Sequence, residues 1–139
     1  NNLENETYGL LYNWDAVITG KLCPEGWHVP TDKEWVILEI FLGGTSSPGN
    51  RLKEAGTEHW IGNQSTVTNS SSFTALPGGW RIGTGYFWDI GTTGYWWSST
   101  GVPYDELNAF SRFLKSEIAL LYAGNAYVKS GLSVRCLKD

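Results

Sequence analysis

Carboxylates close to aromatic segments are the side chains of this sequence with the most scope for chemistry. Asp89 directly follows three aromatic residues, and Asp105 and Glu106 are neighbours in a later segment. Glycoside hydrolysis needs two carboxyl groups on opposite sides of the scissile bond, about 5–9.5 Å apart, which adjacent positions on one loop rarely provide. We therefore interpret these groups as solvated loop charges and expect no catalytic residue. Glycan hydrolysis stays as the less favoured alternative.

The two histidines do not suggest a metal site. His28 and His59 are too few, and too far from a second ligand pattern, to predict zinc binding. Each is expected to cap a turn or to pack against an aromatic ring. The sequence also has no phosphate-binding loop, no H-E-x-x-H and no G-x-S-x-G motif. We therefore expect neither a metal ion nor a cofactor.

The only two cysteines, Cys23 and Cys136, lie far apart in the sequence. A bridge between them would close most of the chain, and the chain-entropy model values a loop of about 100 residues at up to ~4.7 kcal/mol. We favour pairing, which predicts an oxidising, extracellular compartment. Spacing alone leaves open the alternative of two buried free thiols in a cytosolic protein.

Length and composition favour one globular domain, spanning residues 1–139, with exposed aromatic rings. Of the 139 residues, 14% are aromatic, and 8 of these are Trp. The net charge of −4 makes nucleic acid an improbable partner. The run from Trp35 to Leu42 is far shorter than the ~20 apolar residues of a membrane span, so no membrane insertion is expected. The first six residues show no export-signal pattern.

Helices are expected early in the chain and strands late. Thr31 and Glu34 form a capping-box pattern that predicts a helix from Asp32 to Leu42. A second helical turn is expected over 51–55, and an extended segment over 8–17. Short aromatic segments separated by Gly, Ser and Thr predict strands near 86–88, 95–97, 109–114 and 132–137, with a hairpin of 120–122 and 126–129 across Gly124-Asn125. The expected fold is α+β with an antiparallel sheet.

Four segments carry a family resemblance: CPEGWHVPTDKEW at 23–35, FTALPGGWR at 73–81, GYWWSST at 94–100 and GLSVRC at 131–136. In this order they resemble the Fibrobacter succinogenes major paralogous domain, a family of secreted bacterial domains. More distantly, the first and last segments are similar to the C-type lectin-like fold of the formylglycine-generating-enzyme type.

The resemblance implies early helices packed on a twisted antiparallel sheet, long loops, and adjacent termini that a Cys23–Cys136 bridge would suit. Enzymes of the wider superfamily use cysteines in the C-terminal half, where this chain has only Cys136. Their catalysis is therefore not carried over. The calcium-binding triplets of sugar-binding C-type lectins are absent as well, so calcium-dependent sugar binding is not expected.

The aromatic residues divide into motif residues and others. The motif tryptophans, which we expect in the core, are Trp27, Trp35, Trp80, Trp96 and Trp97. Residues between the motifs, in or beside glycine-rich loops, are the candidate ligand contacts: Tyr86, Trp88, Asp89, Tyr104, Asp105, Asn108, Tyr122, Asn125 and Tyr127. The alternative for each is that it only covers the sheet.

The leading hypothesis is a non-catalytic extracellular module that binds a glycan or a surface protein through aromatic loops of its C-terminal half. It would be a monomeric domain within a larger surface protein. The alternative is a structural or adhesin-tip domain of a surface fibre or lipoprotein. A carbohydrate-active enzyme is the third and least favoured hypothesis.

Overall fold

The computed structural model describes residues 3–139, with side chains from residue 6 onward. Of residues 1–6, in which we found no export-signal pattern, only Glu6 has a described side chain. The helical elements are η1 (Leu3–Tyr8), α1 (Trp14–Val17), α2 (Asp32–Phe41) and α3 (Pro48–Leu52). The strands are β1 (Trp27–His28), β2 (Gly78–Arg81), β3 (Phe87–Ile90), β4 (Thr93–Val102), β5 (Asp105–Lys115), β6 (Tyr122–Tyr127) and β7 (Leu137–Lys138). The α+β prediction is confirmed.

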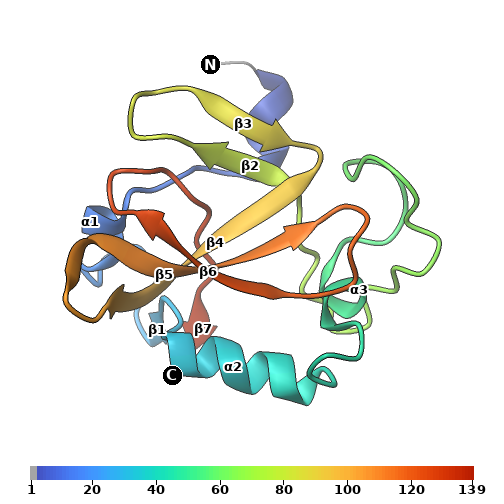
Figure 1. Cartoon of the computed structure of the whole chain (residues 1–139), viewed down its shortest axis with the longest axis horizontal. Helices are drawn as coiled ribbons and strands as arrows, with labels where there is room; N and C mark the ends of the chain where they lie inside the picture. Colours follow the sequence, from blue (N-terminus) through green and yellow to red (C-terminus); the bar gives the residue numbers. More distant parts are fainter. Residues whose placement is uncertain (1–2) are drawn as a thin grey trace.

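The main sheet has five strands in the order β3-β2-β4-β5-β6 (Figure 1). It is mixed, because β2 and β4 run parallel where Gly79 is opposite Gly94, whereas the other neighbours are antiparallel. The prediction of a purely antiparallel sheet is therefore wrong. The reason is topological. The chain reverses direction between β2 and β3 and again between β3 and β4, so β4 has the same direction as β2. Because β4 pairs with the edge of β2 that β3 leaves free, these two strands are parallel neighbours.

Helix α2 confirms the prediction made from its capping box. The Thr31 side chain accepts a hydrogen bond from the backbone N–H of Glu34, and the Glu34 carboxylate accepts one from the backbone N–H of Thr31. These bonds satisfy two N–H groups that a helix start leaves free. The helix packs along one side of the sheet (Figure 1). The second helical turn comes earlier than expected, at α3, because Pro48 has the backbone angle suited to a first helical position.

Hydrophobic residues form two clusters, one on each side of the main sheet. Trp35 of α2 and Trp96 of β4 belong to the first, with Leu52, Trp60 and Leu114. Trp97 belongs to the second, which includes Val17, Val29 and Leu132. Trp96 and Trp97 separate because successive side chains of a strand point to opposite faces. The sheet is therefore covered on both sides.

The core prediction holds for three of the five motif tryptophans. Trp35, Trp96 and Trp97 are buried, and Trp80 is half-buried against the second cluster. The prediction for Trp27 is wrong, since its residue is 43% exposed. Trp27 lies in β1, a strand of two residues that pairs with the equally short β7, and both residues of β7 are exposed as well.

Two strand predictions are wrong for local reasons. Residues 8–17 are not extended: Asn13 accepts a hydrogen bond from the N–H of Ala16 and begins α1, leaving Tyr12 as an isolated bridge to Leu132. The expected hairpin across Gly124 does not form either, because β6 continues through it. A Cβ at Gly124 would lie 3.2 Å from a ring carbon of Phe113, so this glycine makes room for a ring and not for a turn.

The predicted disulfide is confirmed, since Cys23 and Cys136 are bonded across 113 residues of sequence. They lie just before β1 and just before β7, the two strands that pair beside α2 (Figure 1). The expected closeness of the termini is not found, because η1 packs beside β2 through Tyr8 while Asp139 contacts His28. None of the helices between residues 3 and 139 is long and apolar enough to cross a membrane.

His28 links the end of the chain to α2. Its Nδ1 lies 2.6 Å from Oδ1 of Asp139 and its Nε2 lies 3.0 Å from Oε1 of Glu34. A neutral imidazole has one N–H, whereas the protonated ring donates to both carboxylates. The hydrogen bonds to Asp139 and then to Glu34 therefore raise the pKa of His28.

A raised pKa in the folded state has a defined effect on stability. The contribution of His28 should be fully present below its unfolded pKa of about 6.5 and be lost as the pH rises through the higher folded value. We expect His28→Gln to destabilise the protein at pH 5.5 more than at pH 8.5. Urea unfolding of both proteins at the two pH values measures this. An equal loss at both values would show that the ring acts by packing alone.

Candidate functional site

One aromatic ring from each strand of the main sheet lies in a row on the same face of the sheet. In strand order this aromatic row is Trp88, Trp80, Tyr95, Phe113 and Tyr122. Strand register places these residues directly across from one another: Trp80 is opposite Trp88, Tyr95 is opposite Phe113, and Phe113 is opposite Tyr122. The parallel pairing of β2 and β4 completes the row by bringing Trp80 beside Tyr95.

The inner rings of the row support one another. Ring centroids are 5.8 Å apart for Trp80 and Tyr95, 5.6 Å for Tyr95 and Phe113, and 4.9 Å for Phe113 and Tyr122. Such pairs contribute about 0.5–1.5 kcal/mol each beyond the burial of their area. These four residues are half-buried, whereas Trp88, at the β3 end, is 56% exposed. The row is thus a rigid support that presents its terminal tryptophan to solvent.

Asp89 has a backbone conformation that is unusual for a residue in a strand. Its φ is +66°, in the left-handed region that aspartate tolerates better than most residues. Gly79 lies across from this irregularity, and a Cβ there would come within 2.1 Å of the Trp88 carbonyl oxygen. Asp89 Oδ2 accepts a hydrogen bond of 3.0 Å from the Tyr95 hydroxyl. The irregularity therefore places a carboxylate beside the aromatic row.

The Tyr95 hydroxyl is held in its neutral, donating form. Burial, followed by the hydrogen bond to Asp89 and its negative charge, raises the pKa of Tyr95 to about 12. The phenol thus keeps its proton at neutral pH and orients the Asp89 carboxylate. The second carboxylate oxygen has no hydrogen bond among the described residues. It can accept a hydrogen bond from a ligand.

A shallow polar hollow of about 290 Å³ opens beside this pair. It is lined by Asp89, Thr92, Thr93, Tyr95, Lys115, Ser116, Glu117 and Ile118. The Lys115 ammonium lies 5.8 Å from the centroid of the Phe113 ring, so it borders both the hollow and the aromatic row. The hollow thus combines hydroxyl groups, carboxylates and one ammonium group with an aromatic border. It is close to the lower limit of the size range of ligand pockets.

Lys53 fixes the backbone of residues 115–118, which form one wall of the hollow. Its ammonium donates hydrogen bonds to the backbone carbonyls of Lys115, Ser116 and Ile118, at 2.7–3.2 Å. The residue is only 1% exposed, and burial lowers the pKa of Lys53 to about 8. Gln64 also donates to the Ser116 carbonyl. Two side chains from outside the sheet therefore fix the segment after β5.

Comparison with protein families assigns the chain. Residues 1–138 match the family model of the Fibrobacter succinogenes major domain. The chain belongs to this family. No curated protein and no solved structure matches it. The resemblance found in the sequence is thus confirmed for this Fibrobacter succinogenes major domain, while its relation to C-type lectins stays a prediction.

The structure divides the predicted contacts of this Fibrobacter succinogenes major domain between separate places. Trp88, Asp89 and Tyr122 belong to the aromatic row or adjoin it. Tyr104 and Asp105 lie at the tip where β4 turns into β5, the opposite end of the hairpin from the pair Thr93–Lys115. With about 3.4 Å per strand residue, the two ends are roughly 30 Å apart. They cannot contact one small ligand together.

The other predicted contacts lie at further positions. Asn108 donates to Asp105, and this bond lies at the start of β5, where the pairing with β4 is irregular. Tyr86 is exposed in the turn between β2 and β3, and the Tyr127 ring lies against Gly83 of the same turn. Asn125 is exposed on β6 opposite Phe110. These side chains cover parts of the sheet and its turns away from the hollow.

Sequence reasoning missed Tyr95, Phe113 and Lys115. Tyr95 belongs to a family motif whose tryptophans we expected in the core. Phe113 lies in the predicted strand 109–114, and Lys115 directly follows that strand. Residues 111, 113 and 115 share one face by strand periodicity, so the pattern could have placed Phe113 and Lys115 together. It could not show that Tyr95 is their neighbour, because that depends on the pairing of β4 with β5.

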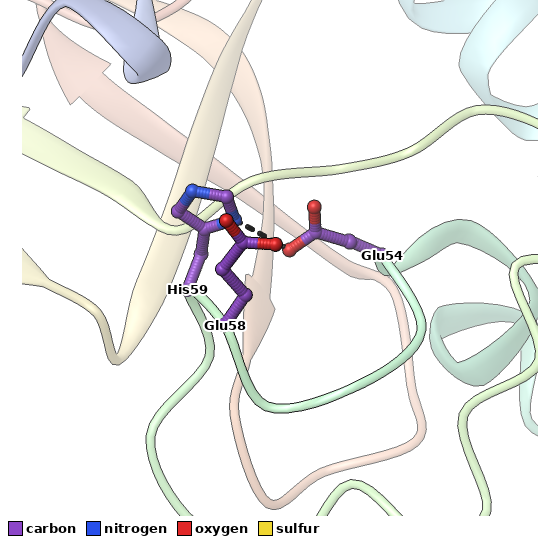
Figure 2. Close-up of side chains that lie close together, drawn as sticks. All are labelled: Glu54, Glu58 and His59. Atoms are coloured by element: carbon purple, nitrogen blue, oxygen red, sulfur yellow. Dashed lines mark hydrogen bonds and ion pairs between the residues drawn. The ribbon is translucent and has the colours of Figure 1, made fainter.

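A second group of polar side chains lies outside the sheet. Glu54, Glu58 and His59 offer ligand atoms that all lie within 4.8 Å of one another (Figure 2). His59 also packs edge-on against Tyr8, as expected for a histidine beside an aromatic ring. Burial, followed by the charge of Glu54, raises the pKa of Tyr8. This group could hold a metal ion.

Proposed function

We propose that the domain is a non-catalytic binding module that recognises a glycan at the surface formed by Trp88, Asp89, Tyr95 and Lys115. The observation that carries the proposal is the exposed Trp88 at the end of a rigid aromatic row, next to the Asp89–Tyr95 pair and the polar hollow. Trp88 and Asp89 are among the contacts expected from the sequence. Tyr95 and Lys115 extend that set.

The chemistry of the surface suits a sugar. A sugar ring has an apolar C–H face, which can pack on an aromatic side chain, and hydroxyl groups around its rim that both donate and accept. Trp88 supplies an apolar surface, Asp89 accepts hydrogen bonds, and Lys115 donates them. A few convergent polar groups beside an aromatic surface are typical of small-ligand sites. The net charge of −4 disfavours a polyanion such as nucleic acid.

The proposal includes an extracellular or cell-surface location and a C-type lectin-like architecture. The location is supported by the Cys23–Cys136 bridge, since disulfides persist mainly in oxidising compartments. The architecture is supported by the packing of α2 on the sheet and by the long irregular connection between α3 and β2.

Replacing Trp88 is the direct test. A panel of bacterial, plant and host glycans is screened with the oxidised protein, and binding of the best glycan is measured by calorimetry. We expect Trp88→Ala to weaken binding at least about tenfold, because a central aromatic contact contributes more than about 1.4 kcal/mol. The melting temperature should change little, since the side chain is largely exposed.

Tyr104→Ala is the matched control, because Tyr104 is an equally aromatic but fully exposed residue at the distant hairpin tip. It should leave glycan affinity unchanged. Equal losses in the two variants would contradict the proposed surface. Binding to no glycan, together with binding to a surface protein that requires Trp88, would instead support the protein-binding form of the hypothesis.

A structural role in an assembly is the second candidate, favoured by the outer side of α2. Ile37, Ile40 and Phe41 are 65%, 68% and 82% exposed, and Val36 adds to the same helix. Several exposed apolar residues on one helix are typical of a contact surface. An adhesin-tip or fibre domain would use such a surface against a neighbouring domain of the same surface protein.

Hydrolysis is the least favoured candidate. Asp89 and Glu117 both line the hollow, so it contains two carboxyl groups. Asp89 accepts a hydrogen bond from Tyr95, which holds its carboxylate in place as a ligand contact. The glycan screen should therefore detect bound protein without the release of reducing ends.

A further inference from the structure

The segment 54–59 after α3 carries three side chains with metal-binding chemistry. Figure 2 shows the carboxylates of Glu54 and Glu58 pointing toward the ring of His59. Nδ1 of His59 lies 2.7 Å from Oε2 of Glu54, and the ligand atoms of all three residues lie within 4.8 Å of one another. One imidazole and two carboxylates therefore converge on one small region.

Both ends of this segment are fixed to the core. Before it, Lys53 is buried and donates to three backbone carbonyls, as described above, and the N–H of Glu54 donates to the Ala75 carbonyl. After it, Trp60 is 1% exposed and its indole N–H donates to the same carbonyl at 2.9 Å. Glu54 and His59 thus start from anchored backbone positions, which lowers the entropic cost of bringing their side chains to one ion.

The distances bracket those of a tetrahedral zinc site. Zinc bonds to histidine nitrogen and carboxylate oxygen are about 2.0–2.2 Å long, which separates tetrahedral ligand atoms by about 3.3–3.6 Å. The distance of 2.7 Å between Nδ1 of His59 and Oε2 of Glu54 is shorter than this tetrahedral separation. The upper limit of 4.8 Å for distances between ligand atoms of the three residues is longer. Side-chain adjustments of about 1 Å, within rotamer freedom, would suffice to reach this geometry.

In the described part of the chain, no side chain outside this group forms an ion pair with its carboxylates. Among the described residues, His59 is the only ion-pair partner of Glu54, and Glu58 has none. The ammonium of the adjacent Lys53 donates its hydrogen bonds to the carbonyls of residues 115, 116 and 118 and not to this group. The side chains of Glu54 and His59 are only 18% and 17% exposed. Two carboxylates near a half-buried imidazole favour the binding of a cation.

The other histidine shows what distinguishes this arrangement. His28 also contacts two carboxylates, but through both of its ring nitrogens, Nδ1 to Asp139 and Nε2 to Glu34. Because these carboxylates lie at opposite nitrogens of the ring, they cannot both bind the same ion as one ring nitrogen. At His59 only Nδ1 is hydrogen-bonded among the described residues. His28 therefore bridges two separate carboxylates by ion pairs, whereas His59 and its two carboxylates face one common point. This difference makes His28 a suitable control for His59.

We propose that Glu54, Glu58 and His59 bind one divalent transition-metal ion, with Zn²⁺ as the preferred ion. A mixed nitrogen and oxygen ligand set favours zinc over the harder magnesium and calcium ions, which prefer oxygen ligands alone. Three protein ligands leave a fourth tetrahedral position for water or for an oxygen of a ligand. The site shares no residue with the proposed glycan surface.

The test is calorimetric titration of untagged, oxidised protein with ZnCl₂ at pH 7.5, with MgCl₂ and CaCl₂ in parallel. We expect one zinc ion per chain and at least about hundredfold weaker binding of magnesium and calcium. Glu58→Gln and His59→Gln should each weaken zinc binding at least about tenfold. Glu58 is exposed, so its variant should keep the wild-type melting temperature and separate ligand loss from unfolding.

His28→Gln is the matched control and should leave the zinc affinity unchanged. The proposal would be overturned by no zinc binding at 1 mM, by an affinity that Glu58→Gln and His59→Gln leave unchanged, or by loss of binding in His28→Gln alone. Equal affinity for zinc and calcium would also overturn it, because it would indicate a general acidic patch. Glycan binding measured with and without zinc distinguishes this proposal from the proposed function.

Discussion

Replacing Cys23 and Cys136 by serine is expected to lower the free energy of unfolding by about 4 kcal/mol. The bond closes a loop across 113 residues, and in the chain-entropy model loops of about 100 residues contribute ~4.7 kcal/mol by restricting the unfolded chain. Without the bond, the two segments that carry the cysteines are held together only by the pairing of β1 with β7, which extends over two residues in each strand. Urea unfolding at pH 7 of the double serine variant and the oxidised wild type measures the difference.

Reduced wild-type protein is the control for the serine substitutions themselves. It should unfold at the same urea concentration as the double variant. A difference below about 1 kcal/mol between oxidised and reduced protein would mean that the packing of α2 and the main sheet stabilises the domain without the bond. Thiol analysis of the protein isolated from its natural host is a separate test of whether it resides in an oxidising compartment.

The second large effect concerns a buried cation. Arg112 of β5 has a side chain only 2% exposed, and its Nη1 lies 2.6 Å from Oδ1 of Asp32 at the start of α2. The two atoms are at ion-pair distance without hydrogen-bond alignment, so their attraction is mainly electrostatic. We expect Asp32→Asn to lower the free energy of unfolding by about 3 kcal/mol, because it leaves a buried charge without its partner.

Asp15→Asn is the matched control for this prediction. Asp15 forms an ion pair with Lys129 in which the two side chains are 51% and 54% exposed. Solvent screens this pair, so its loss should destabilise the protein far less than Asp32→Asn does. The double variant Asp32→Asn/Arg112→Met should recover part of the lost stability, since it removes the stranded charge. Equal effects of Asp32→Asn and Asp15→Asn in urea unfolding would contradict the prediction.

Local signals in the sequence predicted the elements whose causes are local. The capping box of Thr31 and Glu34 determines where α2 begins, because both hydrogen bonds form within four residues. The alternation over 109–114 predicted the centre of β5. By contrast, Gly124 predicted a turn and lies within β6, since the neighbouring Phe113 ring requires the space that glycine leaves. In the sequence, a glycine that forms a turn cannot be distinguished from a glycine that makes room for a neighbouring ring.

The candidate site was only partly predictable for the same reason. The residues predicted as contacts because they lie near glycines included Trp88, at the end of the aromatic row, and Asp89, which lines the hollow. They also included Tyr104, which lies at the other end of the β4–β5 hairpin. Exposure is a property of each residue, and the sequence could suggest it. The distance between two exposed residues depends on strand order and register, which the sequence did not show.

The sequence by itself determined the family, the class of fold, the start of α2 and the presence of two cysteines able to close the chain. These follow from short motifs and from contacts between near neighbours. Only the tertiary structure decided that β2 and β4 run parallel, which places Trp80 beside Tyr95 and completes the aromatic row. It also decided that Glu54, Glu58 and His59 converge. The first arrangement depends on the pairing of strands that are distant in the sequence. The second depends on hydrogen bonds to the Ala75 carbonyl, which anchor both ends of the segment 54–59.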